Sequence, residues 1–323
     1  MVRAIGPWCR SVPALSVRDM GNTRRMGVLL AAATAIISGC AVFINGYGVR
    51  AWADVGDAAT YTTLKNLVAA FVLVGIATIV TRRKSAERLT RPSTARQWIG
   101  LATVAVVGGS VPFILFFEGL SRASSSQAAF LHKTLVVWVA ILAVRFLGER
   151  VGPLHLAAIG LLVMGQVVLV GGVGDLAFGA GELMIVGATL LWSVEVIVAK
   201  RLLGDLSSMT IGVGRMGGGV VLLVAYGLAR GAFAFSGVTG EHLMWIVVTG
   251  IVLAGYVGTW FAALARAQAV DVTAVLVGGA IITAVLRLGV QGAALPSLAG
   301  IGLVAAGAAV AGVAGARRPV AVS

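Results

Sequence analysis

Long apolar blocks separated by short polar segments form the main pattern of the chain. Each block is close to the roughly 20 residues that an α-helix needs to cross the hydrocarbon core of a bilayer. The pattern predicts spans at residues 26–46, 60–81, 97–118, 124–146, 153–172, 181–199, 208–229, 243–264, 270–288 and 295–316. We therefore expect an all-α integral membrane protein of about ten transmembrane helices.

Composition supports the same class. Of the 323 residues, 59% are hydrophobic and only 11% are charged, whereas a soluble domain has roughly 25% charged residues. A net charge of +13 would suggest nucleic-acid binding in a soluble protein. Because most basic residues lie between the apolar blocks, we expect no nucleic-acid partner, and the lipid bilayer is the expected surroundings.

The distribution of Lys and Arg predicts the orientation, since cytoplasmic segments retain basic residues. With the N-terminus inside, 18 of the 25 fall in inside segments, four in outside segments and three within spans. We expect a multi-pass protein of the cell (plasma or inner) membrane with both termini cytoplasmic. Residues 1–25 are expected to be a disordered basic tail, and 317–323 a short C-terminal tail.

The N-terminal region also has features of a cleaved signal. Arg24-Arg25 precedes an apolar stretch that ends in Ile37-Ser38-Gly39-Cys40, which is similar to a lipoprotein cleavage site. We favour a first transmembrane helix instead, because block 26–46 has a counterpart in the second half of the chain and cleavage would break that repeat.

The two halves of the chain resemble each other. Residues 116–123 (FFEGLSRA) align with 260–267 (WFAALARA), and two glycines five residues apart recur at 160–165 and 302–307. The offset lies between 141 and 144 residues. Lys65 and Arg215 occupy similar places early in the second span of each half.

We assign the repeats to residues 26–172 and 173–316. Each contains five spans, an odd number, so the second repeat enters the membrane from the opposite side. Inverted repeats of this kind place a substrate site near the midplane and let it face either side in turn.

Two segments resemble the EamA family of the drug/metabolite transporter superfamily: the run FLGER at 146–150, and 181–202 at the start of the second repeat. The resemblance covers roughly residues 26–316. It implies a ten-helix inverted-repeat carrier with a central cavity, commonly an exporter of metabolites or amino acids. Val136 stands where the family often has proline, and Val290 where the second repeat would have the glutamate, so the sequence lacks the family's signals for kinked fourth and ninth helices.

Charged residues inside spans are the main candidates for function, because each costs about 2.5–3.5 kcal/mol at a helix centre. Lys133 lies near the middle of the fourth span, and we expect it to bind an anionic or carboxylate-bearing substrate. The alternative is a structural lysine paired within the bundle. His132, its neighbour, is a second candidate, although a packed histidine is the favoured interpretation of this residue.

Two further pairs of charges are candidates for gating or coupling. Lys65 and Glu118 both lie toward the outer side, and Glu195 and Arg215 toward the inner side. Each pair could alternate as a gate, or could simply neutralise two costly charges. The tryptophans expected to contact substrate are Trp138, Trp192 and Trp260.

These features favour a secondary transporter that exports a small polar metabolite, either an amino acid or another anionic or zwitterionic solute. A membrane-embedded enzyme or lipid-handling protein is the alternative, and a non-transporting scaffold is the third reading. With only 12 acidic residues and no phosphate-binding loop or metal-ligand spacing, we expect neither enzymatic activity nor a cofactor or metal. The expected partner is a small-molecule substrate, with homodimerisation left open.

Overall fold

The computed structural model describes residues 17–83, 88–120, 122–123, 125–169, 171–172, 179–233, 237–292 and 297–317. All regular secondary structure in these residues is helical. The helices, in chain order, are α1 (Val17–Trp52), α2 (Ala58–Arg82), α3 (Ala95–Val107), α4 (Val111–Leu120), α5 (Ser125–Lys133), α6 (Leu135–Leu147), α7 (Pro153–Leu169), α8 (Ala180–Leu202), α9 (Ser208–Ala229), α10 (Gly240–Arg266), α11 (Ala269–Val277), α12 (Gly279–Gln291) and α13 (Leu298–Arg317).

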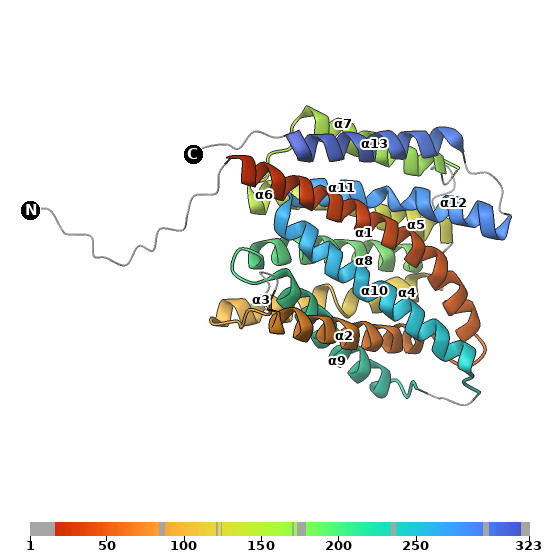
Figure 1. Cartoon of the computed structure of the whole chain (residues 1–323). Helices are drawn as coiled ribbons and strands as arrows, with labels where there is room; N and C mark the ends of the chain where they lie inside the picture. Colours follow the sequence, from red (N-terminus) through yellow and green to blue (C-terminus); the bar gives the residue numbers. More distant parts are fainter. Residues whose placement is uncertain are drawn as a thin grey trace, which may run out of the picture.

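These helices confirm the predicted membrane class. Within the described residues, nine helical segments are long and apolar enough to cross a bilayer, and the 17-residue α7 is a shorter apolar helix. Three of the spans consist of two consecutive helices: α3 with α4, α5 with α6, and α11 with α12. The helices run roughly parallel, and α1 begins at the same end of the bundle at which α13 ends (Figure 1). We call this end the tail end and the opposite one the far end.

The first helix is longer than the sequence pattern predicts. It begins at Val17, so residues 17–25, assigned to a disordered tail, belong to α1. The segment contains no proline and only one glycine, Gly21, so little in it opposes helix formation. Residues 1–16 and 318–323 lie outside the described part of the chain.

The packing of the helices confirms the two inverted repeats. Along most of its length α1 packs on α10, and α8 packs in the same way on α3 and α4. Exchanging the two halves of the chain converts one of these contacts into the other. Two further contacts, α2 with α9 and α7 with α13, each join a helix to its own counterpart, and the contact of α2 with α10 corresponds in the same way to that of α9 with α3. In Figure 1, α7 and α13 form one edge of the bundle, and α2 and α9 lie at the opposite edge.

The fourth and ninth spans are broken, although neither contains a proline. The fourth breaks at Thr134, whose hydroxyl donates to the Leu131 carbonyl at 2.6 Å. The ninth breaks at Gly278, whose N–H bonds to the Val275 carbonyl three residues back at 3.0 Å. A side-chain bond to the backbone and a tight turn at glycine therefore replace proline as causes of the breaks.

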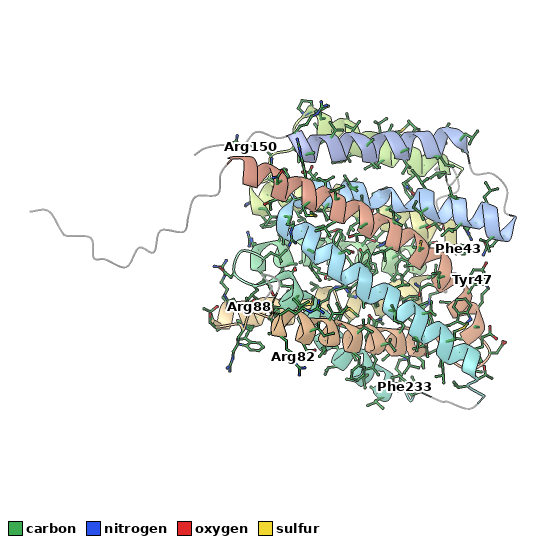
Figure 2. All side chains as sticks on the ribbon, viewed as in Figure 1. Phe43, Tyr47, Arg82, Arg88, Arg150 and Phe233 are labelled. Carbon is green, nitrogen blue, oxygen red and sulfur yellow. The ribbon has the colours of Figure 1, made fainter. Side chains whose placement is uncertain are left out.

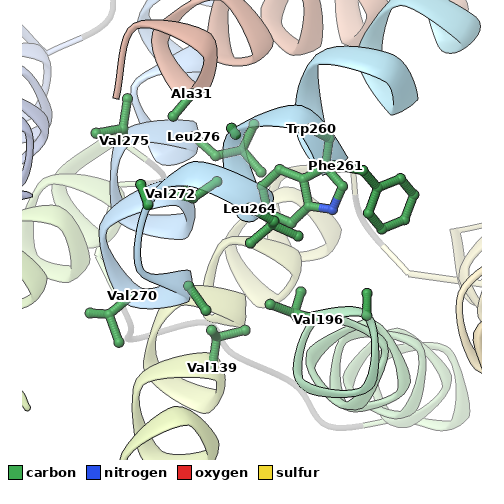
Figure 3. Packing of buried hydrophobic residues seen from close by; sticks show 14 of the residues in the cluster. Ala31, Val139, Val196, Trp260, Phe261, Leu264, Val270, Val272, Val275 and Leu276 are labelled. Atoms are coloured by element: carbon green, nitrogen blue, oxygen red, sulfur yellow. The ribbon is translucent and has the colours of Figure 1, made fainter. Parts of the chain in front are cut away.

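The two repeats pack tightly together in the tail half of the bundle. There α6 packs on α11, and every residue of α11 is buried. Figure 3 shows the apolar cluster formed at this level by side chains such as Val139, Val196, Trp260 and Val272. In the far half no comparable packing joins α5 to α12, and within α12 only Gly279 is buried. The bundle is thus closed at the tail end and looser at the far end.

Close contact between α7 and α13 depends on the glycines of the repeated sequence motif. A methyl group at Gly165 would lie 2.7 Å from Val304 Cγ2 and 2.8 Å from the Val304 nitrogen, and one at Gly307 would lie 3.0 Å from the Ala158 carbonyl oxygen. Gly160, by contrast, has no neighbour that a methyl group would meet within 4 Å.

Gly165→Val should therefore destabilise the protein by about 1–3 kcal/mol, because the valine overpacks against backbone that cannot move independently. Gly160→Val, in the same helix, is the matched control and should have little effect. Thermal unfolding of both variants in detergent checks the prediction. Equal melting temperatures would show that α7 and α13 do not rely on this contact.

Candidate substrate-binding site

The second helix of each repeat starts with the same local structure. Asp57 caps α2 by accepting from Thr60 N at 2.7 Å, and Ser207 caps α9 by accepting from Thr210 N at 3.2 Å. Such side-chain caps satisfy free N–H groups and fix where a helix begins. Lys65 and Arg215 each follow their cap by eight residues. They therefore lie about 12 Å along the helix from opposite ends of the bundle.

Arg215 forms an ion pair with Glu195 of α8. Its Nε donates to Glu195 Oε1, and its Nη2 lies 3.5 Å from Oε2. Both residues are buried, and the guanidinium also lies over the Phe113 ring, 5.6 Å from the centroid. The ion pair anticipated from the sequence is therefore present in the tail half of the bundle.

Lys65 occupies the corresponding position in the far half, but its surroundings differ. Its Nζ donates to Asn45 Oδ1 of α1 at 2.8 Å. The ammonium group lies over two aromatic rings, 5.3 Å from the Tyr61 centroid and 5.1 Å from that of Phe117. Tyr61 is itself fixed by a hydrogen bond of 3.0 Å to Thr249 on α10. Lys65 is therefore a buried cation beside an amide and two rings, and no ion pair with a carboxylate is found for it among the described residues.

These two arrangements are related by the internal repeat. Asn45 and Glu195 are 150 residues apart, and so are Lys65 and Arg215. The same helix positions thus hold an amide with a lysine in one repeat and a carboxylate with an arginine in the other. Asn45 was not among the site residues predicted from the sequence. Asn45 and Glu195 share the offset of 150 residues that relates Lys65 to Arg215, which is larger than the 141–144 of the later motifs, and this shared offset is the signal that would have identified Asn45.

The expected pair of Lys65 with Glu118 is replaced by other contacts. Glu118 lies in the last turn of α4 at the far-end rim, where Arg230 donates to it at 2.7 Å and Arg122 at 3.3 Å. The ammonium of Lys65 turns instead toward Asn45 on α1. The carboxylate of Glu118 thus connects α4 to the end of α9 at a partly exposed position, where an ion pair contributes little to stability.

An aromatic cluster lies beside the Glu195–Arg215 pair. Trp192, one turn before Glu195 on α8, packs 5.6 Å from Phe116 and 4.9 Å from the His132 ring, and its Nε1 donates to the Gly108 carbonyl at 3.2 Å. His132 therefore faces α4 and α8 from the end of α5. This packed environment agrees with the interpretation of His132 as a packed histidine.

Lys133 faces a different part of the bundle from His132. It lines a small cavity with Gln166 of α7 and Val277 of α11, just before the helix break at Thr134. Trp138 is 36% exposed on α6, and its Nε1 donates to Thr134 Oγ1. Trp260 is buried in the apolar cluster of the tail half and stacks on Tyr256 (Figure 3). The five candidates His132, Lys133, Trp138, Trp192 and Trp260 thus do not converge on one cavity.

A cavity of about 130 Å³ opens near Lys65, between α2, α4 and α9. Its walls combine apolar side chains with hydroxyl groups, and its lining includes Thr62, Thr63, Phe113, Phe117, Glu118 and Tyr226. Thr62 is 2% exposed, and its hydroxyl has no hydrogen-bond partner among the described residues. Phe117 connects this cavity to Lys65, because it lines the cavity and its ring centroid lies 5.1 Å from the Lys65 ammonium. The described residues contain no cluster of His, Cys, Asp or Glu arranged to bind a metal.

A second polar cluster closes the tail end, and its residues were not among the candidates predicted from the sequence. Both carboxylate oxygens of Glu149 accept backbone N–H groups at the start of α11, from Ala269 at 2.7 Å and Val270 at 3.1 Å. Lys200 donates to two carbonyls at the end of α10, those of Leu264 and Ala267. Burial raises the pKa of the Glu149 carboxyl, and these two hydrogen bonds only partly offset that effect.

The tail-end cluster includes a buried pair as well. His155 Nε2 of α7 lies 2.9 Å from Asp271 Oδ1 of α11, and both side chains are almost fully buried. Basic side chains such as Arg82, Arg88 and Arg150 also lie toward the tail end of the bundle (Figure 2).

Removal of one charge from the buried ion pair provides a test of its role in folding. Glu195→Gln should lower the stability of the protein by about 3–5 kcal/mol, because it leaves the Arg215 guanidinium buried without a counter-charge. Combining it with Arg215→Met should recover much of the loss. Thermal unfolding of the two single variants and the double variant measures the coupling. A double variant no more stable than Glu195→Gln would contradict a direct pair.

Comparison with known proteins agrees with this architecture. No curated protein matches the sequence significantly. A solved crystal structure shares the fold with a TM-score of 0.69 over 87% of this chain and 96% of its own, at 18% identity. The model of the EamA-like transporter family matches residues 25–171 and again 179–315, one match for each repeat. The chain therefore belongs to the EamA family of the drug/metabolite transporter superfamily.

Proposed function

We propose that this protein is a secondary transporter that exports a small polar metabolite, an amino acid or another anionic or zwitterionic solute, by alternating access. The observation that carries the proposal is the difference between the two repeats. The same helix positions pack tightly in the tail half, where α11 meets α6, and loosely in the far half, where α5 and α12 separate. Exchange of these two conformations between the repeats would close the far end and open the tail end.

The orientation is part of the proposal. The tail end, which carries both termini and the clustered arginines, faces the cytoplasm under the positive-inside rule. The conformation described here would then be closed to the cytoplasm and face outward. Three interactions would hold it in that state: the Glu149 cap on α11, the Lys200 bonds to the end of α10, and the His155–Asp271 pair.

A transport assay tests the function directly. The purified protein is reconstituted into liposomes and assayed for counterflow with labelled amino acids and small organic acids, with and without an imposed pH gradient. We expect saturable movement of at least one solute above protein-free liposomes. Folded protein that moves no solute under any gradient would contradict the proposal and favour an enzyme or a scaffold.

The tail-end closure makes a separate prediction. Glu149→Val copies the residue found at the related position, Val290, and removes both bonds to the start of α11. Hydrogen exchange at the Ala269 and Val270 amides should accelerate by at least about 10-fold, corresponding to the loss of roughly 1.4 kcal/mol of protection. Exchange measured by mass spectrometry checks this. Arg150→Gln is the matched control, and equal exchange in the two variants would show that Glu149 does not hold α11.

A further inference from the structure

Lys65 and Arg215 occupy equivalent positions in the two repeats, but their positive charges are not neutralised in the same way. Arg215 has Glu195 as its counter-charge inside the protein. At the matching place beside Lys65 stands Asn45, which differs from aspartate by one amide nitrogen in place of an oxygen. An amide oxygen accepts a hydrogen bond but carries no net charge, so the positive charge at Lys65 is left uncompensated by this contact.

An ammonium group has three N–H donors, and Asn45 occupies one of them. The faces of Tyr61 and Phe117 add weaker cation–π attraction. Burial of a cation with so few partners is costly, and intramembrane charges generally serve a binding function or are paired. Asn45 therefore leaves Lys65 able to take an anion from outside the protein.

From these contacts, and resting on the proposed transport function, we propose that Lys65 binds the carboxylate of the transported solute, in the role that Glu195 plays for Arg215. The related site shows that a carboxylate fits this helix geometry. A single uncompensated cation suits a single carboxylate group. The neighbouring cavity, lined by Phe113, Phe117 and Leu223, suits an apolar body of modest size.

The same cavity contains further polar groups for such a solute. The Thr62 hydroxyl is buried and lacks a partner among the described residues, one turn before Lys65 on α2. Glu118 also lines this cavity and offers a carboxylate to the ammonium group of a zwitterionic solute. This arrangement assigns the carboxylate to Lys65, whereas the sequence had suggested Lys133, which faces α7 instead.

Replacing the Asn45 side-chain amide with a carboxylate tests the assignment. Asn45→Asp supplies a carboxylate to Lys65 and turns the far-half site into a copy of the Glu195–Arg215 pair. Binding is measured by tryptophan fluorescence and by thermal shift on purified protein in nanodiscs. The probes are the standard amino acids and a series of simple monocarboxylates, each beside its carboxamide. Gln291→Glu, which makes the same amide-to-carboxylate change at an exposed position of α12, is the matched control.

We expect at least one carboxylate to bind the wild-type protein, and its carboxamide to bind at least about 10-fold more weakly, the effect of losing a charge-assisted hydrogen bond. Asn45→Asp and Lys65→Gln should each weaken carboxylate binding by a similar factor, while Gln291→Glu should not. Should Asn45→Asp fail to fold, Lys65→Gln and the carboxamide comparison still decide the outcome.

Three results would overturn the inference. The first is that no carboxylate binds, and the second is that a carboxylate and its carboxamide bind equally. The third is that binding of the tightest carboxylate is unaffected by Lys65→Gln and Asn45→Asp but is lost in Lys133→Gln. The counterflow assay separates these from a failure of the proposed function. A solute that moves normally through Asn45→Asp protein leaves transport intact and removes Lys65 from the site. Absence of all transport in the wild-type protein contradicts the function itself.

Discussion

A cation buried inside a membrane-spanning bundle needs a counter-charge, because lipid offers none and water is largely excluded. Arg215 meets this requirement with Glu195. Lys65, at the same depth from the other end, has an amide and two aromatic rings. The difference between these two solutions separates a cation that is paired within the protein from the cation that we propose binds a solute.

The packing of the repeats places Lys65 in the looser half of the bundle. Closure in the tail half comes from apolar contact between α6 and α11 and from polar contacts at the ends of α10 and α11. At the far end Val290 stands where Glu149 stands at the tail end, and a valine side chain cannot accept the two backbone N–H bonds that Glu149 accepts. The two ends of one symmetric fold are therefore closed with unequal strength, which favours the conformation described here.

The structure altered the set of candidate site residues more than it altered the expected fold. Lys133 attracted attention because a lysine in mid-span is costly, but the helix break at Thr134 directs it toward α7, while His132 faces the aromatic cluster. Trp260, a candidate for substrate contact, is packed within the apolar cluster instead. Asn45 carries no charge, so it was not a candidate in the sequence. Its offset of 150 residues from Glu195 identifies it as the counterpart of that residue.

The sequence by itself determined the membrane class, the spans, the inverted repeat and the family, because each depends on long apolar blocks and local motifs that survive without tertiary contacts. Two features escaped it. Helix α1 starts at Val17, and the breaks at Thr134 and Gly278 have no proline. Only the tertiary structure decided which charges meet. Rotation about a helix axis and the direction of a long side chain depend on neighbouring helices. Glu195 therefore pairs with Arg215, whereas Glu118 and Lys65 contact different partners.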